Sequence, residues 1–141
     1  MIVACPHCAG LNRLPADRMA TTANCGKCKK PLFMATPLEL TSSNFAAHAE
    51  KAELPLVIDF WASWCGPCRS FAPVFSQAAA ELEPQFRFGK IDTEQQQQLA
   101  ARFAIRSIPT LMVIKQGKVL AQQAGALPKT HFYQWLSTIG Q

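Results

Sequence analysis

The chain has 141 residues, of which 49% are hydrophobic and 16% are charged, which suits one domain with a core and a small appendage. No apolar run reaches the roughly 18 residues of a membrane helix, and no secretory signal is visible, so we expect no membrane contact and a cytoplasmic location. The net charge of +5 lies mostly within residues 1–36 without a nucleic-acid recognition motif, so nucleic acid is not an expected partner.

The cysteines fall into three pairs, and two residues separate the members of each pair. The pairs are Cys5 and Cys8, Cys25 and Cys28, and Cys65 and Cys68. In a chain without an export signal, this spacing favours metal binding or redox catalysis over a framework of structural disulfides.

The first two pairs lie within residues 1–36, which we interpret as a metal-binding module with its linker. The linker itself is predicted at residues 31–37, where Pro31 and Pro37 interrupt regular structure. Their C-x-x-C…C-x-x-C spacing is typical of a four-thiolate zinc site. A segment below about 40 residues usually needs a metal or disulfides to fold. We therefore predict one structural Zn²⁺ per chain, and two structural disulfides, an iron site or a redox relay remain as alternatives. The predicted ligands are Cys5, Cys8, Cys25 and Cys28.

Three histidines show no ligand pattern of their own. Four thiolates already fill a tetrahedron, so His7 is expected to be exposed, and no open position for hydrolytic chemistry is expected. His48 and His131 are predicted to be surface residues.

Residues 37–141 alternate between predicted strands and predicted helices. We expect strands at 38–40, 55–62, 86–91, 110–115 and 118–124, and helices at 42–51, from 65 to about 82, at 93–103 and from 128 onward. Helices between strands favour parallel pairing, and the turn at Gln116-Gly117 adds an antiparallel edge. The pattern predicts an α/β fold, with a mixed central sheet and helices on both faces.

The third cysteine pair stands where the strand at 55–62 ends and a helix begins. Cys65 would lie at the positive end of that helix, where unpaired N–H groups favour a thiolate. Cys65 could be exposed with Cys68 packed beneath it, Gly66 would leave the sulfur open to approach, and Pro67 suits a helix start. The alternative, half of a second zinc site, lacks two further ligands nearby. We therefore predict a redox-active pair.

The segment DFWASWCGPC, residues 59–68, resembles the active-site strand and turn of the thioredoxin family. Ile108-Pro109-Thr110 is similar to the cis-proline turn of that family, and Lys90 to the lysine of its third strand. The resemblance covers about residues 38–141. With the added cysteine pairs, the whole chain resembles the zinc-containing bacterial thioredoxins of the thioredoxin 2 type. This implies a thioredoxin fold at residues 37–141 behind a small zinc-ribbon-like module at residues 1–36.

The resemblance implies a thiol–disulfide oxidoreductase that reduces the disulfides of target proteins. Cys65 would attack the target disulfide, and Cys68 would resolve the mixed disulfide. Asp59, beside Lys90, would exchange a proton with Cys68, unless it serves only as a structural partner of Lys90. Pro109 is expected to be cis and to face the sulfur atoms. A target-docking rim is implied at Trp64, Gly66, Pro67, Ile108 and Gly125.

The sequence contains no nucleotide-binding fingerprint, so we expect no bound organic cofactor. By resemblance, an NADPH-dependent thioredoxin reductase supplies the electrons, so NADPH acts only indirectly, and the chain is expected to be a monomer. A binding scaffold and a disulfide-forming oxidase are the alternative functions. The redox pair with Asp59 and Pro109 argues against the scaffold, and Gly66-Pro67 argues against the oxidase. The zinc module remains open as a target filter, a stabilising cap or an oxidation sensor.

Overall fold

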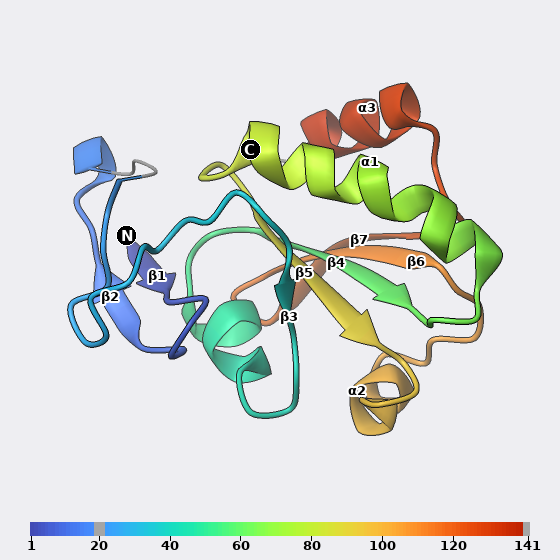
Figure 1. Cartoon of the computed structure of the whole chain (residues 1–141), viewed down its shortest axis with the longest axis horizontal. Helices are drawn as coiled ribbons and strands as arrows, with labels where there is room; N and C mark the ends of the chain where they lie inside the picture. The colour runs from blue at the N-terminus through green and yellow to red at the C-terminus, as the bar shows by residue number, and fades with distance from the viewer. Residues whose placement is uncertain (19–21, 140–141) are drawn as a thin grey trace.

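The computed structural model of the chain describes residues 1–18 and 22–139. The N-terminal segment forms an antiparallel pair of short strands, β1 (Ile2–Ala4) and β2 (Leu11–Arg13), followed by a single 3₁₀ turn, η1 (Ala16–Arg18). This small unit packs at one end of a larger sheet that has helices on both faces (Figure 1). No helix in the described residues is long and apolar enough to cross a membrane.

The larger unit has five strands and alternates with helices as the sequence predicts. Its elements are β3 (Leu38–Glu39), η2 (Ala47–Lys51), β4 (Leu56–Trp61), α1 (Gly66–Leu82), β5 (Arg87–Asp92), α2 (Gln97–Arg102), β6 (Thr110–Lys115), β7 (Lys118–Ala124) and α3 (Lys129–Ile139). The strand order is β3-β5-β4-β6-β7, with parallel pairing among β3, β5 and β4. The sheet is therefore mixed, which confirms the predicted fold class.

Strand β6 corrects one sequence expectation. Antiparallel pairing was predicted only for the final hairpin, but β6 also runs antiparallel to β4, with Thr110 opposite Phe60. The segment 93–109 therefore stays at the end of the sheet where β4 and β5 terminate. This connection brings Pro109 to the edge where β4 leads into α1, and so to the region of the third cysteine pair.

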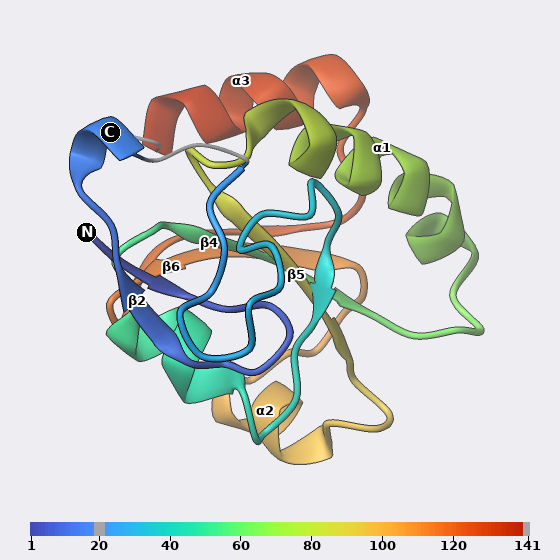
Figure 2. The same ribbon diagram turned by 60° about the vertical axis from the view of Figure 1, so that its left-hand side comes forward.

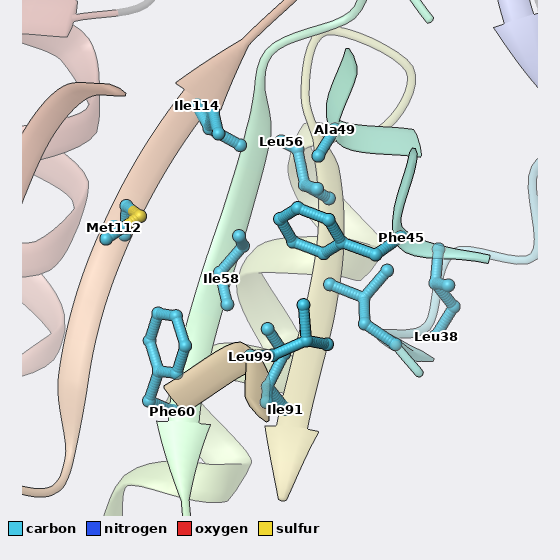
Figure 3. Close-up of a cluster of buried hydrophobic side chains, with 11 residues drawn as sticks. Leu38, Phe45, Ala49, Leu56, Ile58, Phe60, Ile91, Leu99, Met112 and Ile114 are labelled. Carbon is cyan, nitrogen blue, oxygen red and sulfur yellow. The ribbon is translucent and has the colours of Figure 1, made fainter. Parts of the chain in front are cut away.

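The alternation of side chains along the strands produces two cores, one on each face of the sheet. On the face covered by η2 and α2, Ile58 and Phe60 pack with Phe45 and Leu99 (Figure 3). On the other face, Val57 and the neighbouring strands pack against α1 and α3. The most central strand, β4, is buried on both faces, which explains its continuous run of apolar residues.

The segment before β4 differs from the predicted helix. Instead of a regular helix from residue 42, the chain turns at 42–44, and the helical segment begins at Phe45 and continues as the π-helical turn η2, which has no side-chain cap. The Asn44 side chain stabilises the turn, because it accepts from the Thr41 N–H at 2.8 Å and donates to the Glu39 carbonyl at 3.0 Å. These local bonds compete with a regular helix start.

The N-terminal unit is packed tightly against the larger one through a small core of its own. Val3, Leu32 and Phe33 are buried together with Leu54, which precedes β4. Leu32 and Phe33 were predicted to belong to a linker, and their burial corrects that interpretation. Figure 2 shows the β1–β2 unit lying beside the helical turn of η2.

A buried charged cluster joins the same two units. The Arg87 guanidinium donates to the Ala4 carbonyl at 2.9 Å, lies 3.5 Å from the Glu83 carboxylate and stacks 4.8 Å from the centre of the Phe33 ring. Glu83 in turn accepts from the Ala35 N–H at 3.0 Å. The end of α1 and the start of β5 are therefore tied to both β1 and the segment that leaves the N-terminal unit.

His48 was predicted to be a surface residue, and this prediction is wrong. Its side chain is only 2% exposed, on the turn η2 that packs against β1. Burial is the main cause that lowers the pKa of His48 to about 4, and the charge of the nearby Arg87 contributes to the same shift, so the imidazole is neutral at pH 7. The sequence could not show this, because the covering residues come from a distant part of the chain.

Candidate active site and metal centre

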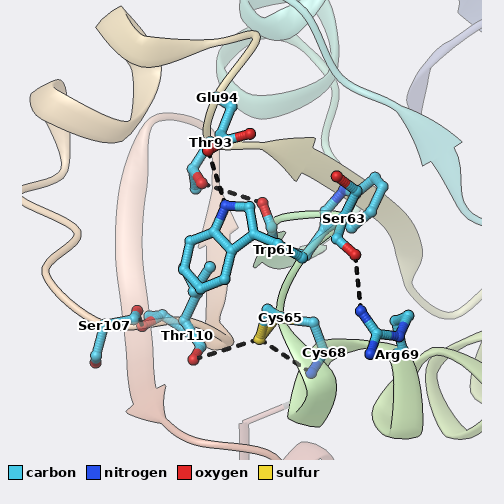
Figure 4. Close-up of a disulfide and its surroundings, with 11 residues drawn as sticks. Trp61, Ser63, Cys65, Cys68, Arg69, Thr93, Glu94, Ser107 and Thr110 are labelled. Atoms are coloured by element: carbon cyan, nitrogen blue, oxygen red, sulfur yellow. Dashed lines mark hydrogen bonds between the residues drawn. A yellow bond between two sulfur atoms is a disulfide. The ribbon is translucent and has the colours of Figure 1, made fainter.

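Cys65 and Cys68 form a disulfide at the start of α1, with their Cα atoms 5.2 Å apart. Cys65 is the N-cap residue of α1, and its sulfur accepts from the Cys68 N–H at 3.2 Å. Pro67 lies in the first turn, where a missing N–H costs nothing. Figure 4 shows the pair at the helix start, where Arg69 also donates to the Ser63 carbonyl at 2.9 Å.

The position of Cys65 favours a thiolate in the reduced protein. The first N–H groups of a helix have no partner within the helix, and the helix dipole adds positive potential there. The bond from the Cys68 N–H already reaches the Cys65 sulfur in the disulfide form. A negative charge that forms on Cys65 during reduction would therefore meet a donor that is already in place.

Contrary to the sequence expectation, Cys65 is not an exposed residue above a buried one. Cys65 is 4% exposed and Cys68 is 2% exposed, so both members of the pair are largely covered in the disulfide form. The Cys65 sulfur lies 3.8 Å from the Ile108 carbonyl oxygen, which covers it from the loop before β6. The loop before β6 therefore covers one side of the Cys65 sulfur.

The loop before β6 forms one wall of the site. The Ile108–Pro109 peptide bond is cis, as the resemblance led us to expect, and Pro109 is buried. The Pro109 carbonyl accepts from the Gly125 N–H at 2.8 Å, whereas the Ile108 N–H has no hydrogen-bond acceptor among the described residues. Gly125 has a φ of +94°, and a Cβ there would meet open space. The Ile108 N–H, next to the disulfide, is thus available to donate to a bound chain.

An apolar surface surrounds the disulfide. Trp64 is 64% exposed, which is unusual for so large a side chain. Its indole N–H donates to the Glu94 carboxylate at 2.8 Å, which holds the ring in one orientation. Trp64 and Ile108 line a shallow hollow of about 200 Å³ that Arg106 also borders. At Gly66 a Cβ would contact nothing within 4 Å, so the space above the helix start is open.

Asp59 is a buried carboxylate on the face of the sheet that α1 covers. It is fully buried, and neither carboxylate oxygen has a hydrogen-bond partner among the described residues. Alternation along β4 puts it on the same face as Val57, which packs in the core beneath α1. Burial raises the pKa of Asp59 to about 7, and the charge of Lys90 partly offsets this.

Lys90 pairs in register with Asp59 across β4 and β5, but its ammonium group lies over the ring of Trp61. The distance from the ammonium group to the centre of that ring is 4.5 Å, a cation–π geometry. Lys90 therefore acts on Asp59 through its charge, and no direct ion pair forms between them in the structure. This leaves the carboxyl group of Asp59 able to take up or release a proton near pH 7.

The other four cysteines come together in the N-terminal unit. Their sulfur atoms all lie within 4.8 Å of one another, with Cys5 to Cys28 at 3.6 Å and Cys8 to Cys25 at 3.7 Å. Zn–S bonds of about 2.3 Å in a tetrahedron give S···S separations of about 3.8 Å. Two separations match this value and the remaining pairs lie within 4.8 Å, so only small shifts would bring all four sulfurs to a tetrahedral zinc ion.

The two cysteine pairs sit in two turns with the same geometry. In each turn the first cysteine's carbonyl accepts from an N–H four residues later, at 2.9 Å from Ala9 and at 3.0 Å from Lys29. Ala9 and Lys29 both have positive φ, 61° and 69°, which the tight turn requires. A Cβ at Gly10 would lie 3.2 Å from the Cys8 sulfur and 2.9 Å from the flexible end of the Lys27 side chain, so a larger residue there would crowd a ligand atom.

Backbone N–H groups point at the sulfurs from these turns, at 3.3 Å from His7 to Cys5 and from Lys27 to Cys25. The pKa of Cys25 is lowered to about 6, mainly by a hydrogen bond from the Cys28 N–H. The pKa of Cys5 is raised to about 12, mainly by burial. Clustered thiolates need a cation to stay ionised together, and the donor set is the one that zinc prefers. His7 is exposed, as predicted.

Four residues at these sites follow no motif that predicts their roles: Glu94 at the redox site, Arg87 and His48 between the units, and Asn12 beside the cysteine cluster. Glu94 follows β5 in a polar stretch with no motif, and nothing in that stretch indicates that it faces Trp64. For Arg87 a signal existed, because a charged residue begins an apolar strand and therefore needs a partner.

Two family models match this chain: "Thioredoxin" over residues 36–138 and "Thioredoxin 2, N-terminal", a zinc ribbon, over residues 4–30. Thioredoxin C-3 of Corynebacterium nephridii is 42% identical over 136 residues, which cover 96% of this chain and 93% of that protein. Thioredoxin of Haemophilus influenzae is 38% identical over 104 residues, covering 74% of this chain and 97% of that protein. Thioredoxin 1 of a Nostoc species is 40% identical over 103 residues, or 73% of this chain and 96% of the relative.

Proposed function

The chain belongs to the thioredoxin family and is a thiol–disulfide oxidoreductase, and from this premise we propose that it reduces target-protein disulfides through Cys65 and Cys68. The observation that carries the proposal is the disulfide at the N-terminus of α1, with a backbone donor already directed at Cys65. We propose that residues 37–141 perform this reaction and that residues 1–36 form the zinc module. A cytoplasmic site of action accords with a reducing role.

The reaction proceeds by two exchanges of sulfur partners. The Cys65 thiolate attacks one sulfur of the target disulfide, which forms a Cys65–target bond and releases the other target sulfur as a thiolate. Cys68 then attacks Cys65, which breaks the mixed disulfide, forms the Cys65–Cys68 bond and frees the second target thiolate. Two electrons pass from the protein to the target in each cycle.

Asp59 supplies the proton step in this scheme. Cys68 must lose its proton before it can attack, and a buried carboxylate on the face that α1 covers is suited to accept it. With a pKa of about 7, Asp59 can both take this proton and return it near neutral pH. Lys90 tunes the pKa of Asp59 through its charge, so we class it as a positioning residue and not as a proton carrier.

Target docking is proposed to use the apolar surface around the disulfide. Trp64, Pro67 and Ile108 provide apolar contact, and the open space at Gly66 and Gly125 lets a target chain lie close to the sulfurs. The unsatisfied Ile108 N–H can donate to the backbone of an extended target segment. Pro109 keeps the loop against the disulfide.

Regeneration requires two electrons from another protein, and we propose an NADPH-dependent thioredoxin reductase as the donor. The chain itself would hold one structural zinc ion at Cys5, Cys8, Cys25 and Cys28 and no organic cofactor. When bound, the ion supplies the positive charge that lets four neighbouring thiolates remain ionised. The four ligands are closed around the ion, so we assign it no step in the disulfide exchange.

A trapping experiment tests the proposed reaction. In Cys68→Ser the resolving thiol is lost, so mixed disulfides with target proteins should accumulate on Cys65 in a cytoplasmic extract. Cys65→Ser is the matched control, because it keeps one thiol but removes the attacking one. Captured proteins are separated without reductant and then identified.

Defined proteins captured by Cys68→Ser and absent from Cys65→Ser are the expected outcome. Equal capture by both variants would mean that Cys65 does not attack targets, and the scaffold function would then be preferred. Addition of thioredoxin reductase with NADPH should re-reduce the wild-type disulfide. Failure of that step alone would refute the proposed electron donor and leave the exchange mechanism standing.

A further inference from the structure

Asn12, on strand β2, makes contacts with both cysteine turns of the metal centre. Its Oδ1 accepts from the Gly26 N–H at 2.8 Å, in the turn of the second cysteine pair. Its Nδ2 donates to the Gly10 carbonyl at 3.2 Å, in the turn of the first pair, and to the Cys25 sulfur at 3.5 Å. One carboxamide therefore joins the two halves of the site and contacts a ligand atom directly.

The orientation of this carboxamide follows from the groups around it. The Gly26 N–H can only donate, so it must face Oδ1, and the Gly10 carbonyl can only accept, so it must face Nδ2. Both requirements agree, and the second N–H of the amide is left directed toward the Cys25 sulfur. The backbone groups of both turns hold the carboxamide in place. The orientation of its N–H toward the Cys25 sulfur is therefore set by these turns and not by the sulfur.

The Cys25 sulfur thereby differs from the other members of the cluster. Cys25 accepts from a side-chain donor as well as from the Lys27 N–H, whereas Cys8 accepts from the Gly10 N–H at 3.4 Å. Hydrogen bonds from N–H groups withdraw charge from a metal-bound thiolate and lower its reactivity toward electrophiles. They also keep the ligand oriented toward the metal.

We propose that Asn12 is a positioning residue of the zinc centre that makes Cys25 the least reactive ligand and slows the loss of the ion. The carboxamide holds the two cysteine turns at the spacing that four Zn–S bonds require. Its N–H to the Cys25 sulfur protects that thiolate from alkylation and oxidation. This role goes beyond the proposed disulfide exchange, because neither Asn12 nor Cys25 takes part in that reaction.

The test compares zinc-loaded full-length protein with Asn12→Ala and Asn12→Asp. Asp keeps the acceptor for the Gly26 N–H but loses the N–H to the sulfur, so it separates the two functions of the carboxamide. Arg13→Gln is the matched control, because it changes the charge beside the site by the same amount as Asn12→Asp and leaves the amide bonds intact. Zinc release after addition of N-ethylmaleimide is followed with a chromogenic zinc indicator.

A second measurement reports on the sulfur itself. With Co²⁺ in place of zinc, loss of the N–H···S bond should move the thiolate-to-metal charge-transfer band to lower energy in both Asn12 variants. Both variants should also release zinc at least about tenfold faster than wild type. Arg13→Gln should keep the band unmoved and release zinc within about twofold of wild type.

Three results would overturn the proposal. Wild-type release rates in both Asn12 variants would show that the carboxamide has no effect on the centre. Faster release with an unmoved charge-transfer band would reduce Asn12 to a structural link between the turns. Wild-type behaviour of Asn12→Asp alone would show that the N–H donor to Cys25 is unimportant.

Discussion

Replacement of Arg87 by Met tests whether the buried charged cluster is what fastens the N-terminal unit to the sheet. The substitution keeps most of the apolar volume but removes the guanidinium, which is 4% exposed at the side-chain level. It breaks the bond to the Ala4 carbonyl and leaves the fully buried Glu83 without a neighbouring positive charge. The consequence should be a large loss of stability and not a change in the redox site.

The size of the stability loss in Arg87→Met depends on the charged group that remains buried. Removal of one partner of a buried ion pair costs about 3–5 kcal/mol, because the other charge stays buried and uncompensated. In the double variant Arg87→Met/Glu83→Gln no charge remains, and Gln can still accept from the Ala35 N–H. We expect the double variant to be about 2 kcal/mol more stable than Arg87→Met alone. Arg102→Met, in an exposed pair with Glu50, should cost less than about 1 kcal/mol.

The pH dependence provides an independent check. Burial raises the pKa of Glu83, and loss of Arg87 removes the main group that opposes this shift. A carboxyl group whose pKa is higher in the folded state than in the unfolded state does not destabilise the fold at a pH below the unfolded-state pKa. It lowers the free energy of unfolding as the pH rises above that value. The deficit of Arg87→Met relative to the double variant should therefore be larger at pH 8 than at pH 5.

Denaturant unfolding of the zinc-loaded proteins measures these differences. The reasoning fails if Arg87→Met loses no more free energy of unfolding than Arg102→Met. It also fails if the double variant is no more stable than Arg87→Met, since the uncompensated Glu83 would then not be the source of the cost.

Further predictions concern the two sites. Asp59→Asn should raise the free energy of unfolding of the disulfide form by on the order of 4 kcal/mol above pH 7. In denaturant unfolding this gain should grow from about pH 4 to pH 7 and disappear in acid. A gain that does not depend on pH would contradict the raised pKa of Asp59. In a reductase-coupled assay, Trp64→Ala should lower kcat/KM for a protein disulfide about tenfold or more. Glu94→Gln keeps the indole and should lower kcat/KM by less. Zinc removal by a chelator should abolish amide-exchange protection in residues 1–18 before it affects β4, and unchanged protection would show that the module folds without metal.

The sequence predicts best where a pattern is local. The apolar run at 55–62 and the turn at Gln116-Gly117 predict β4, β6 and β7 to within about one residue, because these elements depend on contiguous apolar runs and on turn chemistry. The placement of Cys65 at a helix start follows from a contiguous motif. The four clustered sulfurs likewise follow from spacing alone.

The sequence predicts least where burial depends on a distant segment. His48 lies among alanines, without a pattern that marks it as buried, and it is buried because β1 packs on η2. Leu32 and Phe33 are buried because Leu54 lies opposite them. The direction of β6 depends on a loop that stays at one end of the sheet, and loop length does not determine this. The Ile108 carbonyl covers Cys65, and it reaches the site only because β6 runs antiparallel to β4.

The length of α1 has a consequence for how damage to this protein would be repaired. The helix has 17 residues and is about 25 Å long, with the Cys65–Cys68 pair at its start and the contacts to the N-terminal unit at its end. Sulfurs that must touch to exchange are thus held apart by the length of this helix. A chain whose zinc thiolates have become oxidised cannot restore them with its own Cys65, so recovery requires an encounter between two molecules and its rate should scale with protein concentration.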